Sequence, residues 1–239
     1  MRTILSLIFL IILVFCGWSG YKKGLIMGVF SILAFVISVY GANLLAVTYS
    51  VEVVDAMRPF ASGFAEVNIV DKKVRPAMGL DAMTLSTADF FAQNPGREKE
   101  FCTLTYKNMG IFDATSEQMA DEAVAYAREK SADLLDAVVE VLCMRIAYVA
   151  AFLLAFIMVY IVLTVLLNIP NISFKIPNFD AVNDIGGAVL GVVQGVCLLL
   201  VVGWALKFTG LLIPQETLSE TFLVPWFMDQ SILVRYLGI

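Results

Sequence analysis

The stretch "NDIGGAVLGVVQGVCLLLVVGWALK", residues 183–207, places glycines at 187, 191, 195 and 203 in an otherwise apolar run. Glycine destabilises a helix by about 1 kcal/mol relative to alanine, so its repeated use needs a reason. Helices in lipid gain nothing by burying leucine and associate by close packing, which glycine permits. A spacing of four places Gly187, Gly191 and Gly195 on one helix face. The stretch therefore predicts a membrane-spanning helix that packs closely on a neighbour.

The composition of the whole chain also indicates a membrane protein. Hydrophobic residues make up 60% of the sequence, charged residues 15%, and the mean hydropathy is +0.85. Four charge-free stretches meet or approach the ~20 residues that span a bilayer as a helix, namely residues 3–21, 24–51, 146–174 and 185–206. Their continuous apolar runs lack the alternation of a barrel wall. We therefore predict an all-α polytopic membrane protein whose four transmembrane helices form two hairpins.

The polarity of the chain defines its predicted domains. Residues 52–145 carry sixteen of the 21 acidic and ten of the 16 basic residues, which predicts an extramembrane helical segment. It separates a first hairpin, residues 1–51, from a second, residues 146–207. Residues 208–239 are predicted to form an interfacial amphipathic tail, because Trp226, Phe227 and Tyr236 suit the headgroup level. A secretory signal peptide is the alternative for the first span, but the small-x-small cleavage pattern is absent.

One amphipathic helix is predicted within the polar segment, from Thr115 to Leu142. Thr115 and Gln118 fit a capping box at its start, and the helix should run straight towards the third span. Apolar residues recur at helical spacing at Met119, Ala123, Ala127, Leu134, Val138 and Leu142. The opposite face is mainly acidic, so anionic headgroups would repel it. We expect this helix to pack on its neighbours; binding a partner remains an alternative.

A second glycine stripe occurs at the first hairpin, in "GYKKGLIMG", where Gly20, Gly24 and Gly28 repeat the four-residue spacing. The two hairpins thus share one pattern, through an internal repeat or through convergence on close packing. Gln194 lies within the other stripe. Its amide is expected to bond across a helix interface, with a polar path as the alternative.

The start of the fourth span carries two polar residues, Asn183 and Asp184. Either is expected to cap that helix, and Asp184 suits its positive end. No Asp, Glu, Lys, Arg or His lies inside a predicted span, which argues against ion coupling.

These motifs resemble those of the colicin V production protein (CvpA) family. "DIGGAVLGVVQG" (residues 184–195) is similar to the family's aspartate followed by three glycines at four-residue spacing. "KKGLIMGVFSILAF" resembles its basic turn at Lys23, Gly24 and Ser31, and "SETFLVP" (residues 219–225) resembles a Ser-x-x-x-Leu-x-Pro element. The resemblance implies a bacterial inner-membrane protein, here a long variant with an inserted segment between the second and third spans.

Two departures from the family pattern weaken any mechanism based on charge. The family commonly carries a charged pair where this chain has residues 25–28, and often a basic residue where Gln194 stands.

Several kinds of chemistry are excluded by the residue inventory. The chain has no histidine, the commonest general base and metal ligand. Its cysteines lack the spacing of zinc or redox motifs, although Cys102 and Cys143 could form a disulfide on an oxidising side; they are Cys16, Cys102, Cys143 and Cys197. A net charge of −5 argues against nucleic acid. We therefore predict no catalytic residue, metal or cofactor, and no enzyme.

Two functions remain for a chain embedded in the lipid bilayer. The first is a non-enzymatic protein of toxin production, export or envelope homeostasis that assembles with itself or with envelope or secretion membrane proteins. The alternative is a small-solute channel or transporter with a polar path near Gln194. Lys22, Lys23 and Lys175 lie in short turns, so both turns are predicted to be cytoplasmic and the termini and middle segment extracytoplasmic.

Overall fold

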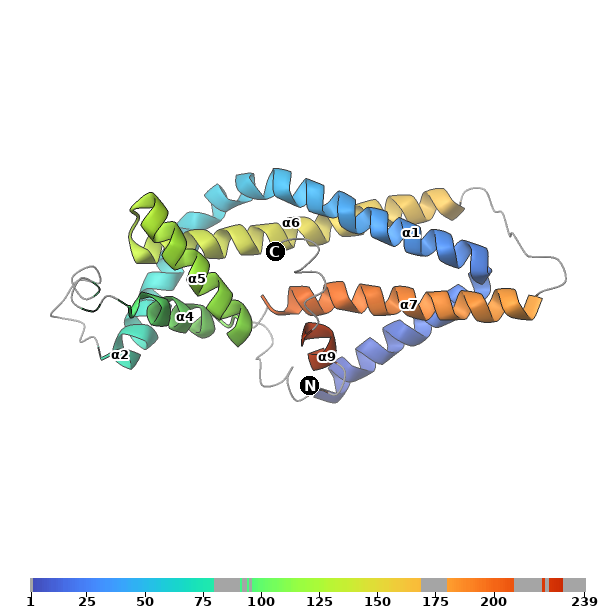
Figure 1. Ribbon diagram of the computed structural model, residues 1–239, viewed down its shortest axis with the longest axis horizontal. Coiled ribbons are helices and arrows are strands. Elements are labelled where there is room, and N and C mark those ends of the chain that lie inside the picture. Colours follow the sequence, from blue (N-terminus) through green and yellow to red (C-terminus); the bar gives the residue numbers. More distant parts are fainter. Residues whose placement is uncertain are drawn as a thin grey trace. The chain divides into compact units, whose positions relative to one another are not determined.

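The computed structural model of the protein describes residues 2–79, 91, 94, 96–168, 180–208, 221 and 224–229 (Figure 1). Every element in these ranges is helical, which confirms the predicted all-α class. The elements are α1 (Arg2–Phe64), η1 (Ala65–Val74), α2 (Arg75–Ala77), α4 (Glu98–Asn108), α5 (Asp113–Lys130), α6 (Leu134–Asn168), α7 (Asp180–Leu206) and α9 (Val224–Asp229). The predicted turn at Lys175 and most of the predicted tail, residues 208–239, lie outside the described residues.

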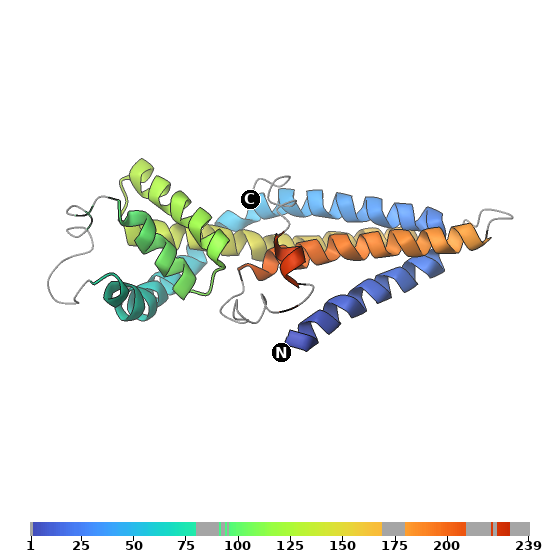
Figure 2. The same ribbon diagram turned by 60° about the horizontal axis from the view of Figure 1, so that its bottom comes forward.

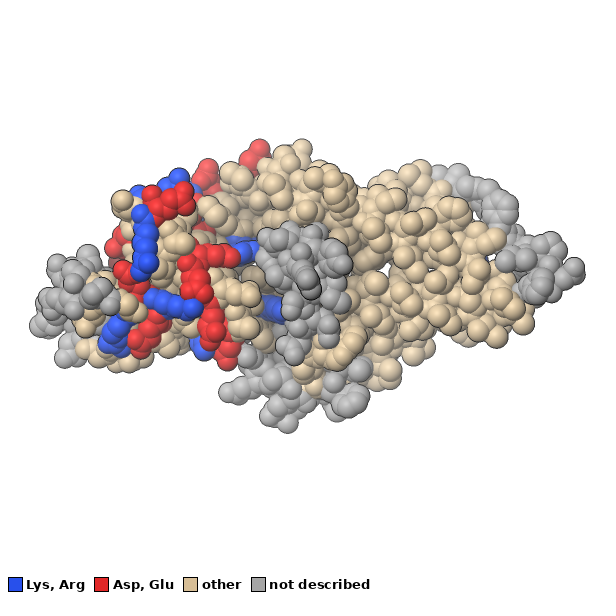
Figure 3. Space-filling view, in the orientation of Figure 1, with Lys and Arg blue, Asp and Glu red and all other residues tan. Residues whose placement is uncertain are grey.

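The chain divides into two compact units. Among the described residues, the apolar unit comprises 2–47, 150–168, 180–206, 221 and 224–229, and the polar unit comprises 48–79, 91, 94, 96–149 and 207–208. Helices α1 and α6 contribute residues to both units. Figure 3 shows acidic and basic side chains gathered together over the polar unit.

Within the described residues, three helical stretches are long and apolar enough to cross a membrane, judged by length and composition: Ile4–Ala77, Leu134–Asn168 and Ala181–Leu206. The sequence predicts four spans, because it treats α1 as two. The difference centres on Gly24, where φ is 77° and ψ is 175°, which are not helical values. Helix α1 therefore consists of two arms, residues 2–23 and 25–64, and Figures 1 and 2 show the chain reversing direction between them.

Aromatic contacts hold the helices of the apolar unit together. Phe35 in the second arm of α1 meets Phe156 of α6 with ring centroids 5.4 Å apart. In the first arm of α1, Phe9 meets Phe227 of α9 at 5.6 Å. Helix α9 also packs on α7, at Gly203. The described part of the C-terminal region is thus fastened to the helices of this unit.

The outer surface of the apolar unit is strongly hydrophobic. Phe15 is 70% exposed and Leu154 is 71% exposed, and many other large aliphatic side chains on α1, α6 and α7 are also exposed. Soluble proteins rarely expose continuous apolar surfaces of this kind. The surface fits contact with lipid.

The polar unit has a core of its own, built by α4, α5, η1 and the first part of α6. Phe101, Tyr106, Met119 and Val138 are almost completely buried there. The Tyr106 hydroxyl donates a hydrogen bond of 2.9 Å to the Val138 carbonyl, so α4 is tied to α6. All six apolar positions predicted for the amphipathic helix lie in or against this core. The prediction that they pack on neighbours is confirmed.

The single helix predicted from Thr115 to Leu142 is wrong in two respects. Helix α5 begins at Asp113, and its N-cap, Phe112, makes no side-chain cap hydrogen bond, so Thr115 does not start a capping box. The helix ends at Lys130, because Ser131 adopts the left-handed conformation with φ 51° and ψ 36°. A new helix, α6, follows at Leu134, and the Asp133 carboxylate accepts a 3.1 Å hydrogen bond from the Leu135 N–H. A side-chain acceptor just before a helix stabilises its start.

Candidate functional site

The central glycines of the two stripes contact each other. A methyl group placed on Gly20 would lie 2.8 Å from the Cα of Gly191, and one on Gly187 would lie 2.8 Å from the Cα of Gly24. One on Gly191 would lie 3.0 Å from the Cα of Gly20. Real side-chain carbons essentially never approach the backbone so closely. The first arm of α1 and helix α7 therefore meet backbone to backbone within the apolar unit.

The outer glycines of the stripes meet side chains. A methyl group on Gly28 would lie 3.0 Å from Cδ1 of Leu190, and one on Gly195 would lie 3.0 Å from Cβ of Cys16. Side chains can adjust where backbone cannot, so these positions tolerate more than the central ones. The contact is narrowest around Gly20, Gly187 and Gly191.

Asn183 locks the break in α1 to α7. Its side chain is 2% exposed, and its Oδ1 accepts a 3.1 Å hydrogen bond from the Leu25 N–H. That N–H follows Gly24, where the helix is interrupted, so it needs an acceptor from elsewhere. Asn183 was expected to cap the fourth span, but α7 begins earlier, at Asp180. The Asn183 side chain therefore accepts its hydrogen bond from α1 and does not cap α7.

A signal for this role exists in the sequence. Asn183 lies four residues before Gly187, so it continues the glycine stripe backwards on the same helix face. Gly186 is a second residue that the sequence analysis missed, because a methyl group there would strike the side chain of Leu25. Leu25, which follows Gly24, therefore contacts α7 at two positions: Asn183 bonds its backbone N–H, and Gly186 leaves space for its side chain.

The three polar residues of the motifs, Gln194, Asp184 and Lys23, do not share one site. Gln194 Nε2 donates a hydrogen bond to the hydroxyl of Tyr160, which joins α7 to α6. Asp184 is half-buried, and its Oδ1 accepts a 3.5 Å hydrogen bond from Asn183 Nδ2. It lies inside α7 and does not cap it. Lys23 is half-buried beside the break, whereas the exposed Lys22 lies 5.2 Å from the ring centroid of Trp18.

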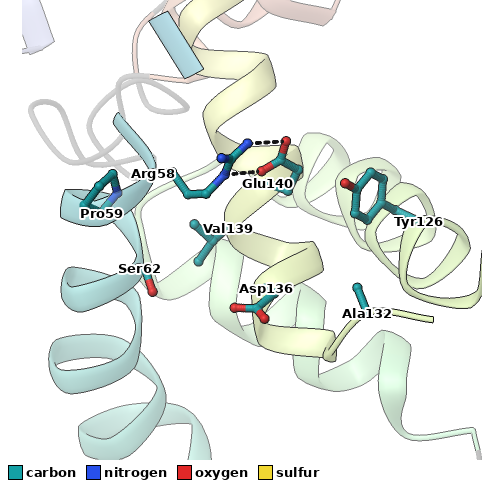
Figure 4. Close-up of a pocket in the computed structure, with 8 residues that line it drawn as sticks. All are labelled: Arg58, Pro59, Ser62, Tyr126, Ala132, Asp136, Val139 and Glu140. Carbon is teal, nitrogen blue, oxygen red and sulfur yellow. Dashed lines mark hydrogen bonds and ion pairs between the residues drawn. The ribbon is translucent and has the colours of Figure 1, made fainter. Parts of the chain in front are cut away.

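A cavity of about 510 Å³ occurs in the polar unit (Figure 4). Helix α1 contributes Arg58, Pro59 and Ser62, and the other lining residues come from α5, α6 and the link between them: Tyr126, Ala132, Asp136, Val139 and Glu140. The Arg58 guanidinium donates to both Glu140 oxygens, at 2.7 and 3.0 Å. This hydrogen bonding is the largest cause of the raised pKa of Arg58. Arg58, the one cation among the described residues of the cavity wall, is thus already paired.

The thiols of the polar unit are buried and unreactive in character. All four cysteines are free, so the conceivable Cys102–Cys143 disulfide is not formed in this structure. Burial, with a smaller contribution from Glu98, raises the pKa of Cys102 to about 12. Burial also raises the pKa of Cys143. A thiolate is the reactive form, so neither side chain suits nucleophilic chemistry.

Within the described residues, no group of three or more His, Cys, Asp or Glu side chains is placed to hold a metal ion.

Comparison with known proteins finds a family to which part of the chain is similar. The family model described as Colicin V production protein matches residues 120–232. This confirms the resemblance carried by "DIGGAVLGVVQG" and "SETFLVP", both of which lie in the match. Residues 1–119, including the first glycine stripe, lie outside it, and the match begins within the segment 52–145 that the resemblance treats as inserted. No curated protein and no solved structure matches the chain.

Proposed function

We propose that this chain, whose residues 120–232 belong to the colicin V production protein family, is a non-enzymatic protein of the bacterial inner membrane. In this proposal it has four spans, with α1 crossing once on each side of Gly24. Its polar unit takes part in assembly with other membrane proteins during toxin production or export, or in envelope homeostasis. The apolar helices and the family match support membrane residence.

The observation that carries the proposal is the contact of Gly20 with Gly187 and Gly191. Such a contact holds two helices together at one fixed register, which is what a stable membrane anchor requires. The hydrogen bonds from Leu25 to Asn183 and from Gln194 to Tyr160 strengthen the same unit. We infer that the apolar unit serves as a closely packed anchor and that the polar unit meets partners.

Crosslinking in native membranes, followed by identification of the attached proteins, tests this function. We expect a partner from a secretion or cell-envelope complex to attach to the polar unit. The probe is a photoactivatable side chain at Glu117, which is exposed on α5, with the same probe at the buried Ala120 as the matched control. Recovery of no specific partner, or equal recovery from both positions, would contradict the proposed assembly.

The alternative is a channel or transporter with a polar path near Gln194, and it has a test of its own. Such a path requires the Gln194 amide to leave the Tyr160 hydroxyl. Purified protein in lipid vesicles should remain impermeable to a broad panel of small solutes under the first proposal. A solute flux through the native protein that disappears in the Gln194→Leu variant would contradict the first proposal and support the channel.

A further inference from the structure

One exposed apolar stripe of the polar unit has no place in the core. It lies on the second arm of α1, where Phe60 is 82% exposed, more than any other large apolar side chain in the described residues. Val53 is 40% exposed and Phe64 is 43% exposed. Ala56 and Gly63 are also exposed, and nothing lies within 4 Å of a methyl group placed on Gly63.

The stripe is separate from the face that α1 turns to the core of the polar unit. Val54 is buried in that core, and Met57 and Ala61 pack against it. In a helix of 3.6 residues per turn, Val53 and Phe60 lie about 80–120° away from the directions of Val54 and Ala61, whereas Phe64 lies about 60–80° away, at the edge of the core-facing side. Folding of the polar unit therefore leaves these side chains uncovered.

The spacing of the stripe fits a helix pair. Val53 and Phe60 are seven residues apart, as are Ala56 and Gly63, and the two series are offset by three. These are the first and fourth positions of a heptad, which line the seam between two parallel helices. Bulky residues alternate with small ones, so a ring on one helix has space opposite it. The seam ends at Phe64, because η1 begins at Ala65 with the wider π-helical turn.

A lipid surface is a poor match for the stripe. Glu52 and Glu66 are exposed at its borders, and Asp55 lies one residue before Ala56. Carboxylates at these positions would be repelled by anionic headgroups.

A second copy of the same chain fits the stripe. All copies of a membrane protein that insert in one orientation present their α1 segments parallel, with equal residues at equal height. In a parallel pair the residue before each bulky position faces the partner residue five further along. Glu52 then faces Met57, and Pro59 faces Phe64, so no acidic pair forms across the seam.

We propose that Val53, Ala56, Phe60, Gly63 and Phe64 form a seam through which two copies of this chain pair side by side in the membrane. The glycine stripes cannot replace this seam, because Gly20, Gly187 and Gly191 contact one another inside a single chain. The seam is small, since a buried phenylalanine contributes about 150–250 Å² and a standard interface needs about 800 Å² per partner. Confinement of both copies to one membrane raises their effective concentration and makes such a contact sufficient. The inference rests on the membrane insertion in the proposed function, and not on a role in toxin production.

Disulfide crosslinking of the full chain in native membranes tests the seam. The background carries alanine at all four cysteine positions. We expect Ala56→Cys, at the seam, to form a dimer on mild oxidation, and Glu117→Cys, exposed on α5, to remain monomeric. Absence of the Ala56→Cys dimer, equal dimer formation at both positions, or a product containing a different protein would overturn the proposal.

A charge substitution provides the second measurement. Phe60→Glu should raise the dissociation constant of the pair by about tenfold or more, read by energy transfer between labelled copies in vesicles at several protein-to-lipid ratios. The helical circular dichroism should not change, because Phe60 is exposed. Unaltered pairing of Phe60→Glu would refute the seam. Resistance of the chain to alkaline extraction from membranes checks insertion separately, so a failure of the seam is distinguishable from a failure of the proposed function.

Discussion

At the scale of single residues, Gly20 is the position where the smallest added group has the largest effect. Taken alone, the higher helix propensity of alanine would stabilise the helix in Gly20→Ala by about 1 kcal/mol. It also forces a methyl group to within 2.8 Å of the Gly191 Cα, and backbone cannot move aside without separating α1 from α7. We expect a net loss of about 2 kcal/mol or more in the free energy of unfolding, since overpacking outweighs propensity. Unfolding by a denaturing detergent, followed by circular dichroism, measures this.

Gly41→Ala is the matched control for Gly20→Ala. A methyl group there would lie 3.7 Å from Cγ1 of Val159, an ordinary contact distance, so stability should be unchanged or rise. Gly191→Leu should be at least as harmful as Gly20→Ala. Equal stability of Gly20→Ala and Gly41→Ala would show that the glycine contact does not hold the helices together.

Asn183 is the second residue on which the apolar unit depends. Asn183→Leu keeps most of the side-chain volume but leaves the Leu25 N–H without its acceptor. Loss of the acceptor in this partly buried contact is expected to lower the free energy of unfolding by about 1 kcal/mol. Asn168→Leu is the control, because the Asn168 amide is exposed and donates to the Thr164 carbonyl of its own helix. The same detergent titration should show a loss for Asn183→Leu and little change for the control.

The buried thiol of Cys102 makes the polar unit sensitive to alkaline pH. Its folded pKa is about 12, raised by burial from the ordinary value of 9.0. The unfolded chain therefore loses this proton at a lower pH than the folded chain. The contribution to stability is fully present below pH 9.0 and falls as the pH rises towards 12. Stability curves of the native chain and of Cys102→Ala over this range should differ in slope, with the steeper loss in the native chain; parallel curves would contradict this.

At the scale of elements, the junction of α5 and α6 depends on Ser131. A residue other than glycine in the left-handed conformation is strained by about 1–2 kcal/mol, and Ser131 has φ 51° and ψ 36°. Ser131→Gly should therefore raise the free energy of unfolding of the polar unit by up to about 1 kcal/mol. Ala125→Gly, at an exposed position within α5, should lower it by a similar amount. Thermal unfolding of both variants checks the opposite signs.

The same junction shows where sequence patterns stop being informative. The apolar spacing from Met119 to Leu142 continues in helical phase across the break, so periodicity alone predicts one helix. Glycine often marks a left-handed residue at a helix end, but serine does not, so Ser131 gives no sign of the break. Asp133 fits the acidic face of a continuous helix as well as it fits the cap of a new one. Thr115 and Gln118 matched a capping box, yet the chain already turns helical at Asp113. Burial of Met119, Val138 and Leu142 was predictable because it depends only on the spacing.

The glycine contact was partly predictable for a similar reason. Four-residue spacing identifies one face of a helix, and it carries no information on which helix that face meets. The sequence thus indicates the face formed by Gly187 and Gly191, whereas its pairing with Gly20 depends on the reversal of the chain at Gly24. The sequence predicts a cap for the helix of Asn183 itself, because a cap is a local motif. The bond to Leu25 instead joins residues 158 positions apart, which no local pattern indicates.

At the scale of the whole molecule, the glycine stripes are used inside one chain. The apolar unit therefore holds itself together, and the surfaces left for other proteins are its lipid-facing sides and the polar unit. The polar unit carries most of the ionised groups, many of them in exposed ion pairs such as Lys99–Asp121 and Arg128–Glu98. Such pairs contribute little to stability individually. They give this unit a charged surface that the apolar unit lacks.

The orientation of the chain provides the last prediction. Lys22 and Lys23 lie in the short turn at Gly24, and lysines in short loops stay in the cytoplasm. The charges of residues 52–145 carry less weight, because long segments translocate largely regardless of charge. With alanine at the four cysteine positions, Glu117→Cys should react with a membrane-impermeant maleimide on spheroplasts, and Lys22→Cys only after permeabilisation. Both side chains are exposed, so folding hides neither. Inverted vesicles should exchange the two results, and labelling of Lys22→Cys on intact spheroplasts would place the polar unit in the cytoplasm.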